Sequence, residues 1–283
     1  MWSLTAPGAT DADALDASRS RLSPLHPRTV RINAARDGIL AAMNTYVDHG
    51  NASTLHTILP HDTVAGTVTK SDMEYLYTGG LASRGGRAIY DAIMGLAPNS
   101  RCPYCGHRRV RQLDHFLPKS KYPSFSVSPL NLVPSCSDCN KDKLADDASH
   151  LEDLPLHPYF DNVDQHTWLI SDLAPGPMPV FLFDIDHGCG LTGTELQRLE
   201  GQFEGLNLGE LYTTEANDEL AAIRLNLRTL LHNVGPNGVQ EFLQDLAVSS
   251  RANQRNSWKT AMYEAACQSA WFCGGGFDDP DLP

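Results

Sequence analysis

The sequence of 283 residues has no apolar run long enough to span a membrane. Its first segment, MWSLTAPGATDADALDASRS, also lacks the basic stretch and the following apolar stretch of a secretory signal. It contains no internal repeat and no long low-complexity tract. We therefore expect a globular protein of the cytoplasm that has no membrane partner.

A disulfide framework is missing as well. The chain has seven cysteines, and an odd number in a chain without a signal is not typical of paired disulfides. Four of the seven form two C-x-x-C pairs, CPYC with Cys102 and Cys105, and CSDC with Cys136 and Cys139. The other three are scattered along the chain.

An overall positive charge is also lacking. The net charge of −12 argues against a general nucleic-acid binder. The charge is uneven, however, because eight Lys or Arg residues and only three acidic residues lie between Arg101 and Lys143. This basic island indicates one local site for a polyanion. Chance clustering of surface charge is the weaker interpretation, since the island coincides with the cysteine pairs.

Composition and the spacing of apolar residues divide the chain into four regions. Residues 1–27 are rich in Ala, Asp, Ser and Pro, which predicts a flexible arm. Residues 28–100 and 151–283 carry apolar side chains mostly at helical spacing, whereas residues 101–150 are basic, cysteine-bearing and interrupted by prolines. The expected fold is α+β, mainly α, with helical flanks around one small metal-bearing module.

The two C-x-x-C pairs predict a structural Zn²⁺ site. Two pairs can supply four thiolates in a tetrahedral shell without an open coordination position. Such a metal site stabilises the fold of a segment that is too small to build its own hydrophobic core. Four unrelated core thiols and a redox C-x-x-C are the alternatives. The redox interpretation fits poorly because there are two pairs and no βαβ pattern. His107, beside the first pair, could replace one thiolate, although a place in the turn of the pair is preferred.

Between the pairs the sequence reads LDHFLPKS and later PLNLVPSCSDCNKDK. A strand is expected to end at Asp114 and His115, a second extended piece contains Asn131, and a helix carries Asn140. These motifs, in this order and ending in C-x-x-C-N-x-x-K, resemble the HNH (ββα-metal, His-Me finger) endonuclease family over roughly residues 101–145. The family often has His at the third signature position, where this sequence has Asn140.

The resemblance implies a ββα-metal nuclease module. It implies that Asp114 and Asn140 hold a catalytic Mg²⁺ or Mn²⁺, that His115 activates water and that Asn131 orients His115. It also favours a phosphate contact by Lys143. We expect five other basic side chains of the module to contact nucleic acid as well: Arg109, Arg111, Lys119, Lys121 and Lys141.

The residue types also suit the chemistry. Phosphodiester cleavage needs an activated water molecule and a Lewis acid at the phosphate. The unperturbed pKa of His115 lies near neutrality, so it is the natural general base, and oxygen ligands such as Asp114 and Asn140 suit a hard cation. Because neighbouring strand residues point to opposite faces, Asp114 and His115 reach one phosphate only if the strand ends or twists there.

A rival motif is FLFDIDHGCG, which places Asp184, Asp186 and His187 after an apolar strand. A polar turn is the more usual interpretation of this stretch than a metal site. TGGLASRGGR is rich in Gly but lacks the Lys-Ser/Thr ending of a phosphate loop.

Two functions remain open. The favoured one is a metal-dependent HNH endonuclease that hydrolyses nucleic acid, with DNA as the expected substrate. The alternative is a non-catalytic zinc module that binds nucleic acid or a protein partner, which needs the cysteines but not Asp114, His115 and Asn140. With its module between helical flanks, the chain resembles effector subunits of bacterial restriction and anti-phage systems, which implies a partner such as a defence-system ATPase.

Overall fold

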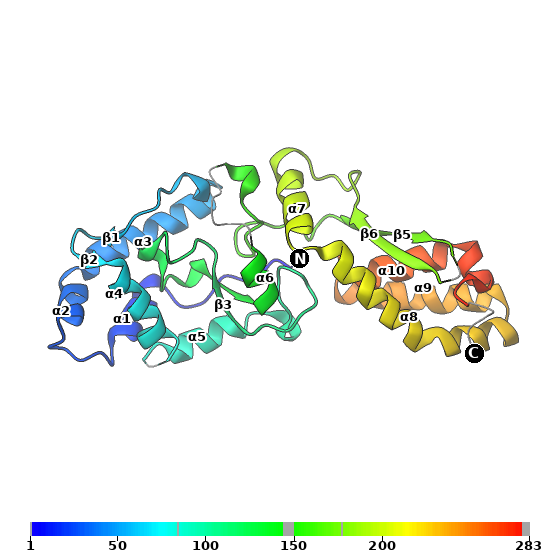
Figure 1. Cartoon of the computed structure of the whole chain (residues 1–283), viewed down its shortest axis with the longest axis horizontal. Helices are drawn as coiled ribbons and strands as arrows, with labels where there is room; N and C mark the ends of the chain where they lie inside the picture. Colours follow the sequence, from blue (N-terminus) through cyan, green and yellow to red (C-terminus); the bar gives the residue numbers. More distant parts are fainter. Residues whose placement is uncertain (1, 84, 144–149, 177, 279–283) are drawn as a thin grey trace. The chain divides into compact units, whose positions relative to one another are not determined.

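The computed structural model describes residues 2–83, 85–143, 150–176 and 178–278 (Figure 1). The chain divides into two compact units, each of which is described by itself. The first unit contains Trp2–Asn162 and Gln197–Gln202, and the second contains Val163–Leu196 and the chain from Phe203 on. In the described part of the chain, no helix combines the length and the apolar character that crossing a membrane requires.

The first unit begins with helices. They are α1 (Asp11–Arg19), α2 (Pro27–Ala34), α3 (Arg36–Asn51), α4 (Lys70–Tyr75), the π-helical segment η2 (Leu76–Leu81) and α5 (Arg87–Met94). A short hairpin of β1 (Thr63–Val64) and β2 (Val68–Thr69) precedes α4. Short 3-10 segments complete the unit: η1 (Leu55–Thr57), η3 (Pro98–Ser100), η4 (Pro123–Phe125), η5 (Pro129–Asn131) and η6 (Leu151–Asp153).

The flexible arm predicted for residues 1–27 needs correction, because α1 lies within it. Thr10 and Asp13 form a capping box at the start of this helix, so each side chain satisfies a backbone N–H that would otherwise lack a partner. Ala14 and Leu15 are fully buried. The polar composition that suggested disorder therefore supplies a helix cap, and two apolar residues are enough to anchor the helix.

One hydrophobic core joins the N-terminal helices to the cysteine-bearing module. It contains Leu15 of α1, Ile39 of α3 and Leu76 of η2, and it continues into Leu113, Val127 and Leu132 between the cysteine pairs. The module therefore does not depend on its own few apolar residues, and residues 28–100 share a core with it.

Within the module, two strands and a helix follow one another in the chain. Strands β3 (Gln112–His115) and β4 (Leu132–Ser135) pair antiparallel, and α6 (Ser137–Asp142) follows β4 directly (green in Figure 1). Pro134 stands opposite Leu113 and has no N–H for the ladder. Leu113 directs its own backbone groups elsewhere: its N–H donates to the Tyr90 hydroxyl and its carbonyl accepts from the Tyr77 hydroxyl, each at 3.4 Å.

The second unit is a hairpin with helices. The strands are β5 (Leu169–Ala174) and β6 (Val180–Ile185), and the helices are α8 (Leu208–Asn233), α9 (Pro236–Asn253), α10 (Trp258–Gln268) and the π-helical η7 (Phe272–Gly276). Helix α7 (Gly193–Gly205) contributes Gln197–Gln202 to the first unit. The fold of the described residues is thus mainly helical with three two-stranded sheets, which is consistent with the predicted α+β, mainly α, class.

Candidate functional site

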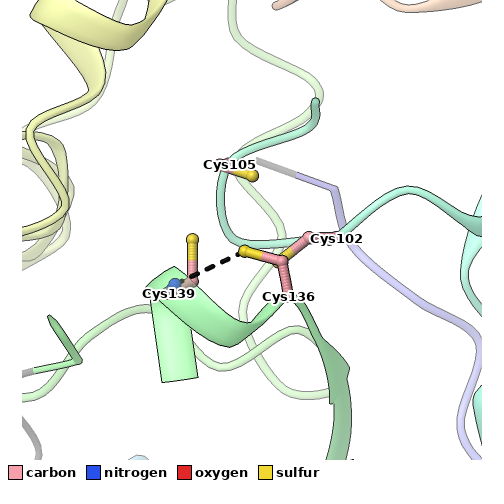
Figure 2. Close-up of side chains that lie close together, drawn as sticks. All are labelled: Cys102, Cys105, Cys136 and Cys139. Carbon is pink, nitrogen blue, oxygen red and sulfur yellow. Dashed lines mark hydrogen bonds between the residues drawn. The ribbon is translucent and has the colours of Figure 1, made fainter. Parts of the chain in front are cut away.

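The four cysteines of the two C-x-x-C pairs come together. Cys102 and Cys105 lie on one loop, while Cys136 and Cys139 lie at the start of α6 (Figure 2). All four are buried, and their sulfur atoms lie within 4.8 Å of one another. A tetrahedral Zn²⁺ with bonds of about 2.3 Å needs sulfurs roughly 3.8 Å apart, so the cluster fits a metal ion. Among the described residues this cluster consists of the four thiols, and His107 is not part of it.

Backbone geometry prepares the first cysteine pair to bind a cation. Gly106 adopts a left-handed conformation, with φ of 64°, and its N–H donates to the Cys102 carbonyl at 2.8 Å. The tight turn also allows the Arg108 N–H to donate to the Cys105 sulfur at 3.3 Å. A hydrogen bond from the Cys102 thiol lowers the pKa of Cys105 to about 7. Loss of this proton is what metal binding requires.

A second feature of the module is a pocket of about 430 Å³. Its lining includes six residues that the sequence predicts to be functional: Asp114, His115, Lys119, Asn140, Lys141 and Lys143. Asp114 and His115 both reach the pocket because β3 ends at His115, so strict alternation no longer separates them. The other predicted residues do not line it: Asn131, Lys121, Arg109 and Arg111.

His115 is held as a neutral imidazole. Its Nε2 lies 2.9 Å from the Ser126 carbonyl oxygen, which can only accept, so Nε2 carries the proton and Nδ1 keeps its lone pair. The Tyr77 ring packs against the imidazole with centroids 4.4 Å apart. Burial, together with the nearby charge of Lys119, lowers the pKa of His115 to about 3. The side chain is therefore unprotonated at neutral pH, as a general base must be.

The carboxylate of Asp114 has two partners at Oδ2. The Lys143 ammonium forms an ion pair with it, and the Tyr104 hydroxyl donates to it at 3.2 Å. Burial and the Asp114 charge hold the pKa of Tyr104 well above its ordinary value, so the hydroxyl keeps its proton. One oxygen of Asp114 thus binds both the Lys143 ammonium and the Tyr104 hydroxyl.

Lys143 lines the pocket, but its ammonium is bound by groups of the protein itself. Its side chain is only 5% exposed, and its ammonium also donates to the carbonyls of His115 at 2.9 Å and Phe116 at 3.0 Å. An ammonium has three N–H donors, and Asp114 with these two carbonyls uses all three. In this arrangement Lys143 links the end of α6 to the end of β3, and its expected contact with a phosphate stays a prediction.

Asn131 acts on the loop between the strands. It is fully buried; its Oδ1 accepts from the Leu117 N–H at 2.8 Å, and its Nδ2 donates to the carbonyls of Leu117 at 3.1 Å and Phe125 at 3.2 Å. Phe125 precedes Ser126, whose carbonyl accepts from His115. Any effect of Asn131 on the imidazole therefore passes through the loop backbone.

Three tyrosines at this site escape the sequence reasoning. Tyr77 and Tyr90 line the pocket from η2 and α5, in the N-terminal helical region, and Tyr104 reaches Asp114 from within the first cysteine pair. Only Tyr104 carried a signal, because it stands between two predicted zinc ligands. Nothing in the spacing of Tyr77 or Tyr90 connects them to residues of the module.

The rival motif in the second unit is the end of β6 and the turn that follows it. Asp186 Oδ1 accepts from the Gly188 N–H at 2.8 Å, and Asp184 Oδ1 accepts from the Ile185 N–H at 2.7 Å. Together with His187 these residues form no metal-ligating group among the described residues. The polar-turn interpretation of this stretch accounts for its geometry.

Comparison with known proteins gives the module a family. Residues 102–146 match the sequence model of the HNH endonuclease family. The chain is similar to protein ea31 of Escherichia phage lambda, with 28% identity over 239 residues, or 78% of this chain and 79% of that protein. It is also similar to the Septu protein PtuB of Bacillus thuringiensis, with 34% identity over 83 residues, or 28% of this chain and 32% of the relative. No solved structure matches the chain. The chain therefore carries an HNH endonuclease domain at residues 102–146, with four cysteines positioned to bind a metal ion.

Proposed function

We propose that this protein is a metal-dependent endonuclease that hydrolyses phosphodiester bonds of nucleic acid, with DNA as its substrate. The observation that carries the proposal is one pocket lined by the neutral imidazole of His115, the carboxylate of Asp114 and the amide of Asn140. These groups supply a proton acceptor and two oxygen donors, which is what water activation and a hard cation require.

The positions of these residues support a role for each of them. His115 Nδ1 accepts the proton of the attacking water, while the bond from Nε2 to Ser126 keeps the ring in one orientation. Asp114 and Asn140 would hold Mg²⁺ or Mn²⁺, which supplies positive charge to the phosphate. Strands β3 and β4 followed by α6 are the elements expected of a ββα-metal module, and they bring the three residues to one pocket.

The zinc and the catalytic cation are proposed as separate metals. Four thiolates leave Zn²⁺ no open coordination position, so the cysteine cluster has a structural role. The catalytic cation instead has oxygen ligands in the pocket. Lys119 and Lys141 line this pocket, and with Lys121, Arg109 and Arg111 they would attract the phosphate backbone.

The biological setting is part of the proposal. Similarity to the Septu protein PtuB supports a role in a defence system. We propose that the nuclease works in the cytoplasm beside a protein partner such as an ATPase. The helical regions outside residues 102–146 are the candidates for contact with that partner.

The test is cleavage of supercoiled plasmid and of single-stranded RNA by the zinc-loaded protein at matched Mg²⁺. We expect the wild type to cut plasmid and His115→Ala to cut it about 10² to 10⁴ times more slowly, the usual size of a general-base contribution. His107→Ala, a histidine of the same module outside the pocket, serves as the control. Equal cleavage by wild type and His115→Ala on both substrates would leave the non-catalytic zinc module as the better description.

A further inference from the structure

The ammonium of Lys143 is surrounded by three oxygen atoms of the protein. Asp114 Oδ2 and the carbonyl oxygens of His115 and Phe116 all contact the ammonium. One carboxylate and two carbonyls form a donor set that hard divalent cations also use. The ammonium therefore sits on the same kind of ligand set that a catalytic cation at Asp114 would need.

Burial makes it unfavourable for the Lys143 ammonium and a divalent cation to share these oxygen ligands. The side chains of Lys143 and Asp114 are 5% and 7% exposed, so water screens their charges poorly. A divalent cation on the Asp114 carboxylate would stand beside the ammonium at close range, and like charges in a poorly screened site repel strongly. Repulsion between the two positive groups therefore weakens their simultaneous contact with one carboxylate.

We propose that Lys143 competes with the catalytic cation for Asp114, and that the ammonium leaves the carboxylate when the cation binds. This inference rests on the proposed function, because it takes Asp114 as a ligand of the cation. The displaced ammonium then needs a new anion, and the pocket is where the substrate phosphate would provide one. Cation and nucleic acid thus bind cooperatively, and the cation alone binds weakly.

The first experiment measures the affinity of the full zinc-loaded chain for Mn²⁺, without nucleic acid, from the electron paramagnetic resonance signal of free Mn²⁺. The variant is Lys143→Met, and the matched control is Lys141→Met, which removes one positive charge from the same pocket but breaks no contact with Asp114. We expect Lys143→Met to bind Mn²⁺ about tenfold or more tightly than Lys141→Met, the size of effect that a close like charge has on an ionic equilibrium. Equal affinities would overturn the inference.

A second measurement uses the unmodified protein and decides the question even if Lys143→Met does not fold. Lysines are acylated with and without saturating Mn²⁺, and each site is quantified by mass spectrometry. We expect Lys143 to react slowly in the absence of Mn²⁺ and several times faster in its presence, while Lys141 reacts equally in both. Unchanged protection of Lys143 at saturating Mn²⁺ would show that the ammonium stays in place.

Failure of the inference can be told apart from failure of the proposed function. If Asp114→Asn binds Mn²⁺ as tightly as the wild type, Asp114 is not a ligand and the proposed cation site itself is wrong. If Asp114→Asn loses Mn²⁺ but Lys143 neither competes nor becomes reactive, only the role of Lys143 is wrong.

Discussion

The cysteine cluster and the pocket lie side by side in sequence on α6, yet they differ in almost every physical respect. Cys139 belongs to the cluster, and the next residue, Asn140, lines the pocket. The cluster consists of four buried sulfurs that can close completely around a metal ion. The pocket is lined by oxygen and nitrogen donors and stays open to a substrate. In the proposed function, the cluster stabilises the fold and the pocket changes its contacts during cleavage.

The two sites also differ in their dependence on the rest of the unit. All four cysteines come from the HNH domain itself. The pocket takes Tyr77 and Tyr90 from the N-terminal helical region, and the shared core places those helices against β3. The helical flank is thus a part of the site. Variants that affect one site but not the other can test this division.

The largest effect is expected for the cluster. Cys136→Ser should lose the single bound zinc and with it binding free energy on the order of 10 kcal/mol, comparable with the whole stability of a domain. Because α1 to α5 share the core of the module, we expect the first unit to unfold as a whole, while the second unit keeps its helices. Elemental analysis and thermal unfolding followed by circular dichroism check this.

Cys189→Ser is the matched control, since Cys189 lies in the second unit outside the cluster. It should keep the zinc and the unfolding temperature. One zinc per chain in Cys136→Ser would contradict the four-cysteine site.

The next effect belongs to the pocket. Asp114→Asn keeps an oxygen that can accept from Tyr104 and Lys143, so the fold and the zinc should survive. The loss of the negative charge should weaken binding of the catalytic cation. We expect cleavage at fixed Mg²⁺ to fall about a hundredfold or more, at or above the upper end of the 10- to 100-fold loss typical of outer-shell changes. Excess Mg²⁺ should restore part of the rate. A variant that is as active as the wild type at every Mg²⁺ concentration would exclude Asp114 as a ligand.

The third effect is a pH profile that separates a buried base from an exposed one. With an ordinary pKa of 6.5, His115 would be mostly protonated at pH 5 and cleavage would fall about thirtyfold from its plateau. Burial lowers this pKa to about 3, so the base stays neutral and His115 should cause almost no loss of rate between pH 8 and 5. Single-turnover cleavage at saturating Mg²⁺ measures this. A rate that declines with a midpoint near 6.5 would show that the imidazole is hydrated in the working enzyme.

The same shift affects stability. The folded pKa of His115 lies below the unfolded value of 6.5, so the folded state binds fewer protons. The free energy of unfolding should therefore fall by up to about 1.4 kcal/mol per pH unit from this group as pH drops from 6.5 towards 3. His115→Ala should lack this part of the slope.

A smaller effect tests the contribution of the helical flank. Tyr77→Leu removes the ring that packs on His115, and loss of orientation should lower kcat about tenfold with little change in KM. Tyr77→Phe keeps the ring and loses only the 3.4 Å bond to Leu113, so its kcat should stay within about twofold of the wild type. Equal losses in both variants would mean that the hydroxyl, and not the ring, carries the effect.

The smallest effect concerns the rim of the pocket. Lys119→Ala should weaken DNA binding a few-fold and reduce the slope of log affinity against log salt by about 0.9, as loss of one phosphate contact would. Fluorescence anisotropy over a salt series measures both quantities. Lys70→Ala, a lysine of α4 outside the pocket, should leave the slope unchanged. Identical slopes for wild type and Lys119→Ala would remove Lys119 from the interface.

Residues close in sequence were predictable because their chemistry depends on short spacing. The C-x-x-C pairs place two thiols on one turn, and an Asp-His pair at the end of a strand before a proline-rich loop places both side chains at one edge. The helical character of the flanks followed from apolar periodicity in the same way. In residues 1–27, by contrast, composition alone does not reveal that Leu15 is buried.

The sequence by itself determined the metal-binding cysteines, the Asp-His-Asn motif and the mainly helical fold, because each is encoded in local pattern and residue type. Only the tertiary structure decided that Tyr77 packs on His115, that Lys143 occupies Asp114 and that Asn131 binds loop backbone. It also decided the protonation state of His115, since its low pKa results from burial. These properties depend on which distant segments pack together and exclude water, and sequence spacing carries no record of that packing.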